Sequence, residues 1–261
     1  MKKIRADQLL VEQNLAVTCT KACALIMSGC VYVGTEQIKK PSELFPSETK
    51  FNIKGKNHPY VGRGGVKLKA ALDAFSISPQ NKTCLDVGVS TGGFTDCLLQ
   101  EGAKKVYAVD VGYGQLDWKL RQNSRVILFE KTNFRYFDVN LISEKIDLVV
   151  VDVSFISLEK IIPKIIEMIL KKSNPGPSLI PFALAGDNFP PTLIFLIKPQ
   201  FEVEAKFVEK GGIVRNELKR MECVQKITHF ILENKMKIIG SIASPLLGSD
   251  GNQEYLLAVR C

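Results

Sequence analysis

The stretch that decides the fold of this chain is Cys84-Leu85-Asp86-Val87-Gly88-Val89-Ser90-Thr91-Gly92-Gly93-Phe94-Thr95-Asp96. It reads as an apolar strand, an acid-x-Gly turn and two further glycines that open an amphipathic helix. A second apolar run, Lys105–Val109, follows and ends in another acid, Asp110. This order predicts a nucleoside-binding crevice at the carboxyl edge of a parallel sheet, where glycines let the backbone approach the ligand and Asp110 accepts hydrogen bonds from ribose hydroxyls.

The spacing of the glycines narrows the choice of nucleotide. Dinucleotide sites follow the pattern G-x-G-x-x-G and hold a pyrophosphate at the helix N-terminus. Here the pattern is D-x-G-x-x-x-G-G, with Asp86 two residues before the first glycine. A carboxylate there would repel a pyrophosphate but suits a cationic ligand without phosphate, and S-adenosylmethionine (SAM) fits that description. A glycine-rich turn in some other α/β protein is the alternative, since short glycine patterns are weak signals.

Composition and charge indicate a globular protein with a polyanionic partner. The 261 residues are 46% hydrophobic and 24% charged, which is typical of a chain with a substantial core. The formal charge of +8 favours a polyanion, with an anionic membrane surface as the weaker alternative. The sequence shows no secretion signal and no uncharged apolar run of membrane-spanning length, so we expect a cytoplasmic protein.

The seven cysteines have no regular pairing, which indicates a reducing compartment. Cys19, Cys23 and Cys30 are close in sequence but have no fourth candidate ligand nearby, whereas zinc prefers tetrahedral sets of four. We therefore expect these cysteines to pack as small apolar side chains, and we expect no metal site. The sequence carries no signal for an oligomeric state.

Two units are expected along the chain. Residues 1–56 read as a small α+β domain with two short helices, the second ending at Gly29. A linker follows at 57–64, and residues 65–261 alternate helices with strands, which favours βαβ units in a doubly wound sheet. The strands of this second unit are expected at 83–87, 105–109, 126–129, 146–152, 193–197, 237–241 and 255–259, and its longer helices at 65–75, 158–171 and 218–234.

The segment 173–191 interrupts this alternation. It holds five prolines and shows no helical period, so we expect a long irregular excursion between a helix and a strand. Long connections without secondary structure are usually functional or mobile, and the sequence favours neither of these two explanations.

Two charged residues stand at the ends of apolar strands. Asp152 ends the most apolar strand of the chain, and Lys198 ends the next apolar strand. Because ligands bind outside the carboxyl ends of parallel strands, we expect both side chains to project into the crevice that Asp86 and Asp110 line. A solvated strand end or a structural ion pair is the alternative for each of them.

The order of four charged residues resembles that of a known family. Lys67, Asp152, Lys198 and Glu254 follow one another as in the Lys-Asp-Lys-Glu tetrad of ribose 2′-O-methyltransferases of the FtsJ/RrmJ type. The sequences around them resemble the TlyA family in particular, and they read YVGRGGVKL (60–68), DVSFISL (152–158), KPQFE (198–202) and GNQEY (251–255). That family joins an N-terminal S4-type RNA-binding domain to such a methyltransferase, and its S4 part resembles residues 5–53 of this chain.

The resemblance implies SAM-dependent 2′-O-methylation of a ribose, with a cytidine of ribosomal RNA as the target. It implies Lys198 as the general base, Asp152 as the residue that orients it, and Lys67 and Glu254 as residues that position the ribose. A lysine can act as a base only when neutral. We therefore expect the pKa of Lys198 to fall, pushed down by Lys67 and opposed by the two acids.

The glycine motif and the strand-end acid supply the expected cofactor residues, and the basic first domain and linker supply the expected RNA contacts. We expect Asp86 near the methionine amino group of SAM, and Thr132 or Asn133 beside the adenine. The full set expected to hold SAM is Asp86, Gly88, Ser90, Gly92, Gly93, Phe94, Asp110, Thr132 and Asn133. The phosphates of ribosomal RNA, alone or within a ribosomal subunit, are expected to contact Lys3, Arg5, Lys21, Lys54, Lys56 and Arg63.

Two features depart from the family pattern. The segment 173–191 is longer than the family leads us to expect, and the S4 turn reads Val33-Gly34-Thr35-Glu36 where an Asn-Gly turn is more usual. The first departure bears on how substrate or cofactor enters the active site, and the second on how tightly the small domain binds RNA.

Two other functions remain as alternatives. Members of this family are often labelled haemolysin, which would make the chain membrane-active, although we expect no stable membrane insertion. The chain could instead be an RNA-binding module whose methyltransferase half is degenerate, which the complete tetrad opposes. Methylation of an amino group is disfavoured, because Asp152-Val153-Ser154-Phe155 lacks the two prolines typical of such enzymes.

Overall fold

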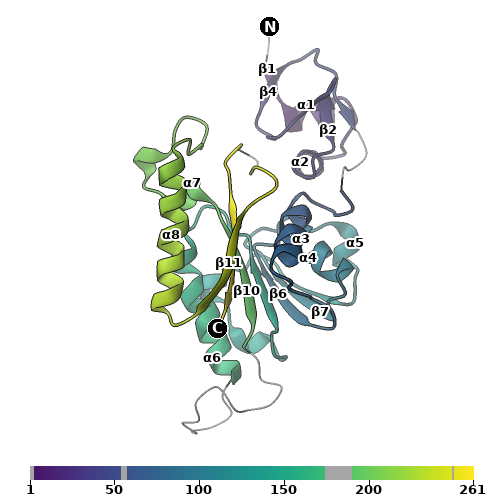
Figure 1. Ribbon diagram of the computed structural model, residues 1–261. Helices are drawn as coiled ribbons and strands as arrows, with labels where there is room; N and C mark the ends of the chain where they lie inside the picture. The colour runs from purple at the N-terminus through teal and green to yellow at the C-terminus, as the bar shows by residue number, and fades with distance from the viewer. Residues whose placement is uncertain (1–2, 54–57, 174–189, 249) are drawn as a thin grey trace.

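The structure is a computed structural model that describes residues 3–53, 58–173, 190–248 and 250–261. Within these residues the largest sheet has seven strands in the order β11-β12-β10-β9-β6-β7-β8 (Figure 1). Its strands are β6 (Thr83–Val87), β7 (Lys105–Val109), β8 (Val126–Phe129), β9 (Leu148–Val151), β10 (Thr192–Ile197), β11 (Lys237–Ala243) and β12 (Tyr255–Arg260). The strands from β6 to β10 run parallel, whereas β12 is antiparallel to β10 and to β11. The predicted α/β fold is confirmed, and its sheet is mixed.

The connections between strands leave a crevice between β6 and β9. From β6 the chain runs outward through β7 and β8, and it then returns to the other side of β6 through β9 and β10. The order reverses between β6 and β9, and ligands of open α/β sheets bind at such a reversal, outside the carboxyl ends of the strands. Gly88 follows β6 and Asp152 follows β9, so two of the predicted site residues lie next to each other there.

Helices cover both faces of this sheet, because successive side chains of a strand point to opposite faces. Leu85, Val87 and Tyr107 face α6 and α8, whereas Cys84 and Val106 face α3, α4 and α5 (Figure 1). The apolar strands are thus packed from both sides, which holds their polar carboxyl ends in place. The helices are α3 (Gly64–Ala74), α4 (Gly93–Gln100), α5 (Trp118–Arg121), α6 (Ile162–Ser173) and α8 (Glu217–Glu233). Shorter helical turns are η1 (Phe134–Tyr136), η2 (Val139–Leu141), η3 (Leu158–Lys160), α7 (Pro199–Glu202) and η4 (Ala205–Phe207).

Residues 3–53 form a small unit with a hydrophobic core of its own, built on Leu9, Leu10 and Ile26. It contains the two predicted helices, and Gly29 follows the second one with a positive φ of 78°. Glycine adopts that conformation without strain, so it ends the helix there. The elements are β1 (Lys3–Arg5), α1 (Ala6–Glu12), α2 (Cys19–Met27), β2 (Val31–Val33), β3 (Glu36–Gln37), β4 (Leu44–Pro46) and β5 (Asn52–Ile53).

The predicted helix at 158–171 is two elements. A 3₁₀ turn, η3, is followed by α6, which begins at Ile162. Pro163 has no backbone N–H, so it fits the first turn of a helix but would cost a hydrogen bond inside a longer one. The expectation of one continuous helix from 158 is therefore wrong.

Most of the segment 173–191, predicted as an irregular excursion, lies outside the described residues. Within the part of the chain that the structure describes, no helix combines the length and the apolar character that crossing a membrane requires.

Glu202 joins the two loops that carry the charged strand-end residues. It lies in α7, close after Lys198, and is buried. Its Oε2 accepts a hydrogen bond from the Ser157 hydroxyl (2.6 Å), and its Oε1 accepts one from the Leu158 amide (2.8 Å). Burial raises the pKa of Glu202, and these hydrogen bonds oppose the rise. Because Ser157 and Leu158 follow Asp152 on the neighbouring loop, this carboxylate fixes the β9 and β10 loops relative to each other.

We expect Glu202→Ala to lower the free energy of unfolding by about 1–3 kcal/mol, because the buried Leu158 amide loses its acceptor. Urea unfolding followed by circular dichroism measures this change. Glu204→Ala removes an exposed glutamate of the same segment and is the matched control, with an expected change below about 0.5 kcal/mol. Equal effects of the two substitutions would contradict the bridging role of Glu202.

Candidate active site

A pocket lies at the carboxyl ends of β6, β9 and β10, where the glycine turn meets the charged strand ends. Residues from the N-terminal unit, from α3 and from the start of β12 complete its wall. Its lining residues are Met27, Arg63, Gly64, Lys67, Gly88, Val89, Ser90, Thr91, Gly93, Phe94, Asp152, Ser154, Lys198 and Glu254. All four residues of the predicted tetrad therefore border one cavity.

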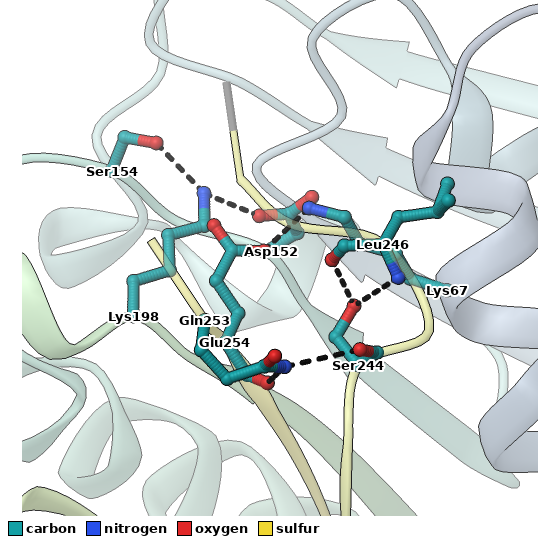
Figure 2. Close-up of polar contacts among 8 residues, drawn as sticks. All are labelled: Lys67, Asp152, Ser154, Lys198, Ser244, Leu246, Gln253 and Glu254. Atoms are coloured by element: carbon teal, nitrogen blue, oxygen red, sulfur yellow. Dashed lines mark hydrogen bonds and ion pairs between the residues drawn. The ribbon is translucent and has the colours of Figure 1, made fainter. Parts of the chain in front are cut away.

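The tetrad is organised as two ion pairs (Figure 2). Lys198 Nζ lies 2.6 Å from Asp152 Oδ1 and also donates a hydrogen bond to the Ser154 hydroxyl at 2.9 Å. Lys67 Nζ lies 2.5 Å from Glu254 Oε2, and these two side chains are only 11% and 3% exposed. Charges this far from water are stable only when paired, so each residue of the tetrad holds its partner in position.

The pKa of Lys198 differs from the expectation drawn from the sequence. Burial lowers the pKa of this ammonium, but attraction to Asp152 and then to Glu254 raises it, and the resulting pKa is above the ordinary lysine value. The expected fall in this pKa is therefore wrong for the protein without substrate. The physical reason is that Glu254 already neutralises Lys67, whereas Asp152 lies at ion-pair distance from Lys198.

The glycine turn depends on close approach of backbone segments. Gly88 has a φ of +90°, and a Cβ built on it would lie 2.3 Å from the carbonyl oxygen of Asp152. Gly92 has a φ of +95° and precedes the first residue of α4. Any larger residue at Gly88 would push β6 and β9 apart, which explains why the sequence has glycine at this point.

Asp86 lies in β6 behind the pocket rather than on its surface, and it is completely buried. Its Oδ2 accepts a hydrogen bond from the Thr95 hydroxyl (2.7 Å), and its Oδ1 has no partner among the residues that the structure describes. Burial raises the pKa of Asp86 to about 7; the Thr95 hydrogen bond opposes this rise, and the carboxylates of Asp152 and Asp110 add to it.

Asp110, Thr132 and Asn133 lie at the ends of the next two strands, outside the lining of this pocket. The Asp110 carboxylate accepts hydrogen bonds from the amides of Ser90 and Gly112, both at 2.7 Å. The Thr132 amide donates to the Asp110 carbonyl (2.9 Å), so these two residues are adjacent as expected for one binding site. The Asn133 side chain caps η1, which is a structural task that the sequence did not indicate.

Four of the residues expected to contact RNA are lysines of the N-terminal segment. Lys3 and Lys21 are exposed on β1 and α2. Lys54 and Lys56 lie outside the described residues, as does the first residue of the expected linker at 57–64.

The two arginines expected to contact RNA are placed differently. Arg5 directs its guanidinium at the Asp7 carboxylate, with Nε–Oδ1 and Nη2–Oδ2 distances of 3.0 and 2.6 Å. This bidentate pair engages two of the five guanidinium N–H donors, and the side chain stays 47% exposed. Arg63, in the expected linker, lines the pocket that the tetrad borders.

Sequence reasoning missed several residues in and around this site, among them Ser154, Thr95 and Met27. Ser154 follows Asp152 closely in the chain, and its hydroxyl could have been noted as a partner for a lysine. Thr95 belongs to the quoted stretch, but its bond to Asp86 depends on how α4 packs on β6. Met27 comes from α2 of the N-terminal unit, and no sequence signal connects it to the pocket.

The raised pKa of Asp86 predicts a dependence of stability on pH. Between its ordinary value of 3.8 and about 7, the folded protein holds a proton on Asp86 that the unfolded chain has lost. The stability contributed by this proton is complete below the unfolded pKa and is lost as the pH rises through the folded pKa. Wild type should therefore lose about 3 kcal/mol relative to Asp86→Asn between about pH 5 and about pH 8.

Urea unfolding of both proteins at the two pH values measures this difference. Asp73→Asn, at a carboxylate that is 62% exposed, is the matched control and should show no comparable change with pH. A difference between wild type and Asp86→Asn that stays constant with pH would contradict the raised pKa.

Comparison with known proteins agrees with this geometry. Residues 60–261 match the family described as FtsJ-like methyltransferase. The 16S/23S rRNA (cytidine-2′-O)-methyltransferase TlyA of Mycobacterium tuberculosis is 36% identical over 99% of this chain and 90% of its own. Hemolysin A of Brachyspira hyodysenteriae is 38% identical over 97% of this chain and 98% of its own. The solved structure of a hemolysin candidate from Streptococcus thermophilus is 36% identical, covers 100% of this chain and 89% of that chain, and has a TM-score of 0.71.

The family match covers the seven-stranded sheet and all four residues of the tetrad. The two curated relatives extend the similarity through the N-terminal unit, because they align with nearly the whole chain. The resemblance inferred from the order of charged residues is therefore confirmed. This chain belongs to the FtsJ-like methyltransferase family, in its TlyA branch, and its sheet has the Rossmann-like fold of these enzymes.

Proposed function

We propose that this chain transfers a methyl group from SAM to the 2′-hydroxyl of a ribose in ribosomal RNA, with cytidine as the methylated nucleotide. The observation that carries the proposal is the assembly of Lys67, Asp152, Lys198 and Glu254 around one pocket beside the glycine turn. The Mycobacterium tuberculosis relative is named for this reaction on cytidine in rRNA. A degenerate methyltransferase half would have lost some of these contacts, so the intact pairs oppose that alternative.

The residues around the end of β6 fit SAM as the cofactor. The positive φ values of Gly88 and Gly92 expose the backbone of the turn to a ligand. The Oδ1 of Asp86, which has no partner among the described residues, is a buried acceptor suited to a cationic ammonium group. Bound SAM supplies a methyl group already activated on a sulfonium. We assign its binding to Asp86, Gly88, Ser90, Gly92, Gly93, Phe94, Asp110, Thr132 and Asn133.

The tetrad prepares the ribose hydroxyl for reaction. Lys198, as a neutral amine, accepts the proton of the 2′-hydroxyl, and Asp152 orients this amine and stabilises the ammonium that forms. Ser154 restrains the same nitrogen from another direction through its hydrogen bond. Lys67 and Glu254 hold each other in a nearly buried pair and position the ribose in the pocket.

We assign RNA binding to an S4-type domain at 1–56, followed by a linker at 57–64 and a methyltransferase domain at 65–261. The separate core of residues 3–53 supports this division. The exposed Lys3 and Lys21, together with the net charge of +8, supply attraction to phosphates. The 2′-hydroxyl selects RNA over DNA, since DNA lacks the acceptor of the methyl group. A ribosomal substrate places the reaction in the cytoplasm.

Methyl transfer from labelled SAM to purified ribosomal subunits, followed by nucleoside analysis, tests this function. We expect 2′-O-methylcytidine with wild type and a loss of at least about 100-fold in kcat with Lys198→Ala, because the general base is gone. SAM affinity should stay within a few-fold. Lys206→Ala, which removes an exposed lysine paired with Glu204, is the matched control and should keep wild-type activity.

The outcomes separate the parts of the proposal. Full activity of Lys198→Ala would contradict its role as base. A labelled nucleoside methylated on the base rather than on the ribose would contradict the reaction. Loss of SAM binding in Lys198→Ala would show that this lysine supports the cofactor rather than the chemistry.

The raised pKa of Lys198 predicts the pH dependence of the reaction. Because the base must be neutral, the rate should rise with pH towards a pKa above the ordinary lysine value. Asp152→Asn removes the strongest attraction that raises this pKa, so the rising limb should move to lower pH even though the maximal rate falls. Profiles of kcat against pH for the two proteins measure the shift. If the rate rises over the same pH range in both proteins, the pairing of Lys198 with Asp152 during turnover is contradicted.

A further inference from the structure

A buried asparagine, Asn252, lies shortly before Glu254 and has no part in the roles assigned above. The residue is only 1% exposed. Its Oδ1 accepts a hydrogen bond from the amide of Val214 (2.8 Å), and its Nδ2 donates one to the carbonyl of Gly212 (2.7 Å). Both partners belong to residues 209–214, here called the 209–214 hairpin, which is closed by an antiparallel bridge between Glu209 and Ile213. Asn252 therefore ties this hairpin to the segment that leads into β12.

The same segment holds the Glu254 carboxylate in place. The Gly248 amide donates to the Asn252 carbonyl (2.8 Å), which turns the chain back over Glu254. A Cβ built on Gly248 would lie only 2.4 Å from Glu254 Oε1, so the carboxylate packs directly on this glycine. The Ser244 amide donates to the Glu254 carbonyl (2.8 Å), and Figure 2 shows Glu254 directed at Lys67.

The N-terminal unit contacts the same place. Lys40 Nζ donates a hydrogen bond to the Gly211 carbonyl (3.3 Å) and lies 3.3 Å from the Asp250 carboxylate. Lys40 of the N-terminal unit therefore contacts both the 209–214 hairpin and the segment that carries Glu254. The position of the 209–214 hairpin relative to Glu254 is set by the two side-chain hydrogen bonds of Asn252.

We propose that Asn252 is a positioning residue for methyl transfer, which ties the 209–214 hairpin to the segment before β12 and so holds the Glu254 carboxylate at Lys67. This inference rests on the proposed function, because it assigns Asn252 to the same tetrad. The side chain is suited to the task because an amide is both donor and acceptor, and here both halves bind backbone groups of one hairpin. Without it, the buried Val214 amide loses its acceptor and the segment can shift.

Steady-state kinetics of Asn252→Ala with SAM and ribosomal subunits test the inference. We expect kcat to fall by at least about tenfold, because displacement of a reacting group by about 1 Å is enough for such a loss. The KM for SAM should stay near the wild-type value, since Asn252 does not line the pocket. Asn252→Asp keeps the size and the acceptor but places a carboxylate oxygen against the Gly212 carbonyl, so it should lower kcat in the same way. Urea unfolding of both variants checks that they are folded under the assay conditions.

The control is Asn216→Ala, which removes an exposed helix cap from Lys219 next to the hairpin. It should destabilise the protein measurably in urea, as caps do, and leave kcat unchanged. A fall in kcat in both Asn252 variants but not in Asn216→Ala therefore supports positioning rather than general loss of stability.

The remaining outcomes distinguish this inference from the proposed function. Wild-type kcat in both Asn252 variants, together with a low kcat in Glu254→Gln, overturns the inference and leaves the proposed function standing. A raised KM for SAM with an unchanged kcat also overturns it. Absence of methyl transfer to ribosomal RNA by wild type means that the proposed function itself fails.

Discussion

The pairing of four charges at the edge of the sheet is the constraint on which the rest of this site depends. All four side chains are largely buried, and each forms an ion pair: Lys198 with Asp152, and Lys67 with Glu254. An unpaired charge at such depth costs several kcal/mol, so none of the four residues can occupy its place alone. The sheet order β12-β10-β9-β6 brings three of them together, and α3 packs beside them with the fourth.

Neighbouring backbone segments and side chains hold the two ion pairs in position. Gly88 allows β6 and β9 to approach until a Cβ would meet the Asp152 carbonyl. Glu202 fixes the β9 and β10 loops to each other through Ser157 and Leu158. On the far side, the turn that begins at Gly248 packs against the Glu254 carboxylate. The polar groups at the site are thus restrained by buried hydrogen bonds, which is what preorganised chemistry requires.

Much of the fold could be predicted because its strands are apolar runs that end in acids or glycines. The bounds of β6, β7 and β8 agree with the predicted ranges, since β6 and β7 are buried almost throughout, β8 is partly buried, and the apolar runs stop where polar residues or glycine begin. The helix predicted at 158–171 failed because periodicity does not register the missing N–H of Pro163. The direction of the Lys198 pKa also failed, because it depends on which acid lies nearest in space.

The sequence by itself determined the chemistry available to this protein. The family is indicated by the glycine turn after Asp86, by the acids and lysines at strand ends, and by their order along the chain. Only the tertiary structure decided which charges of the tetrad pair, that Met27 reaches the pocket, and that Asn252 binds the 209–214 hairpin. The physical reason is that strand patterns follow from local burial and can be read along the chain. The paired charges of the tetrad are far apart in the chain and come together only when the sheet forms.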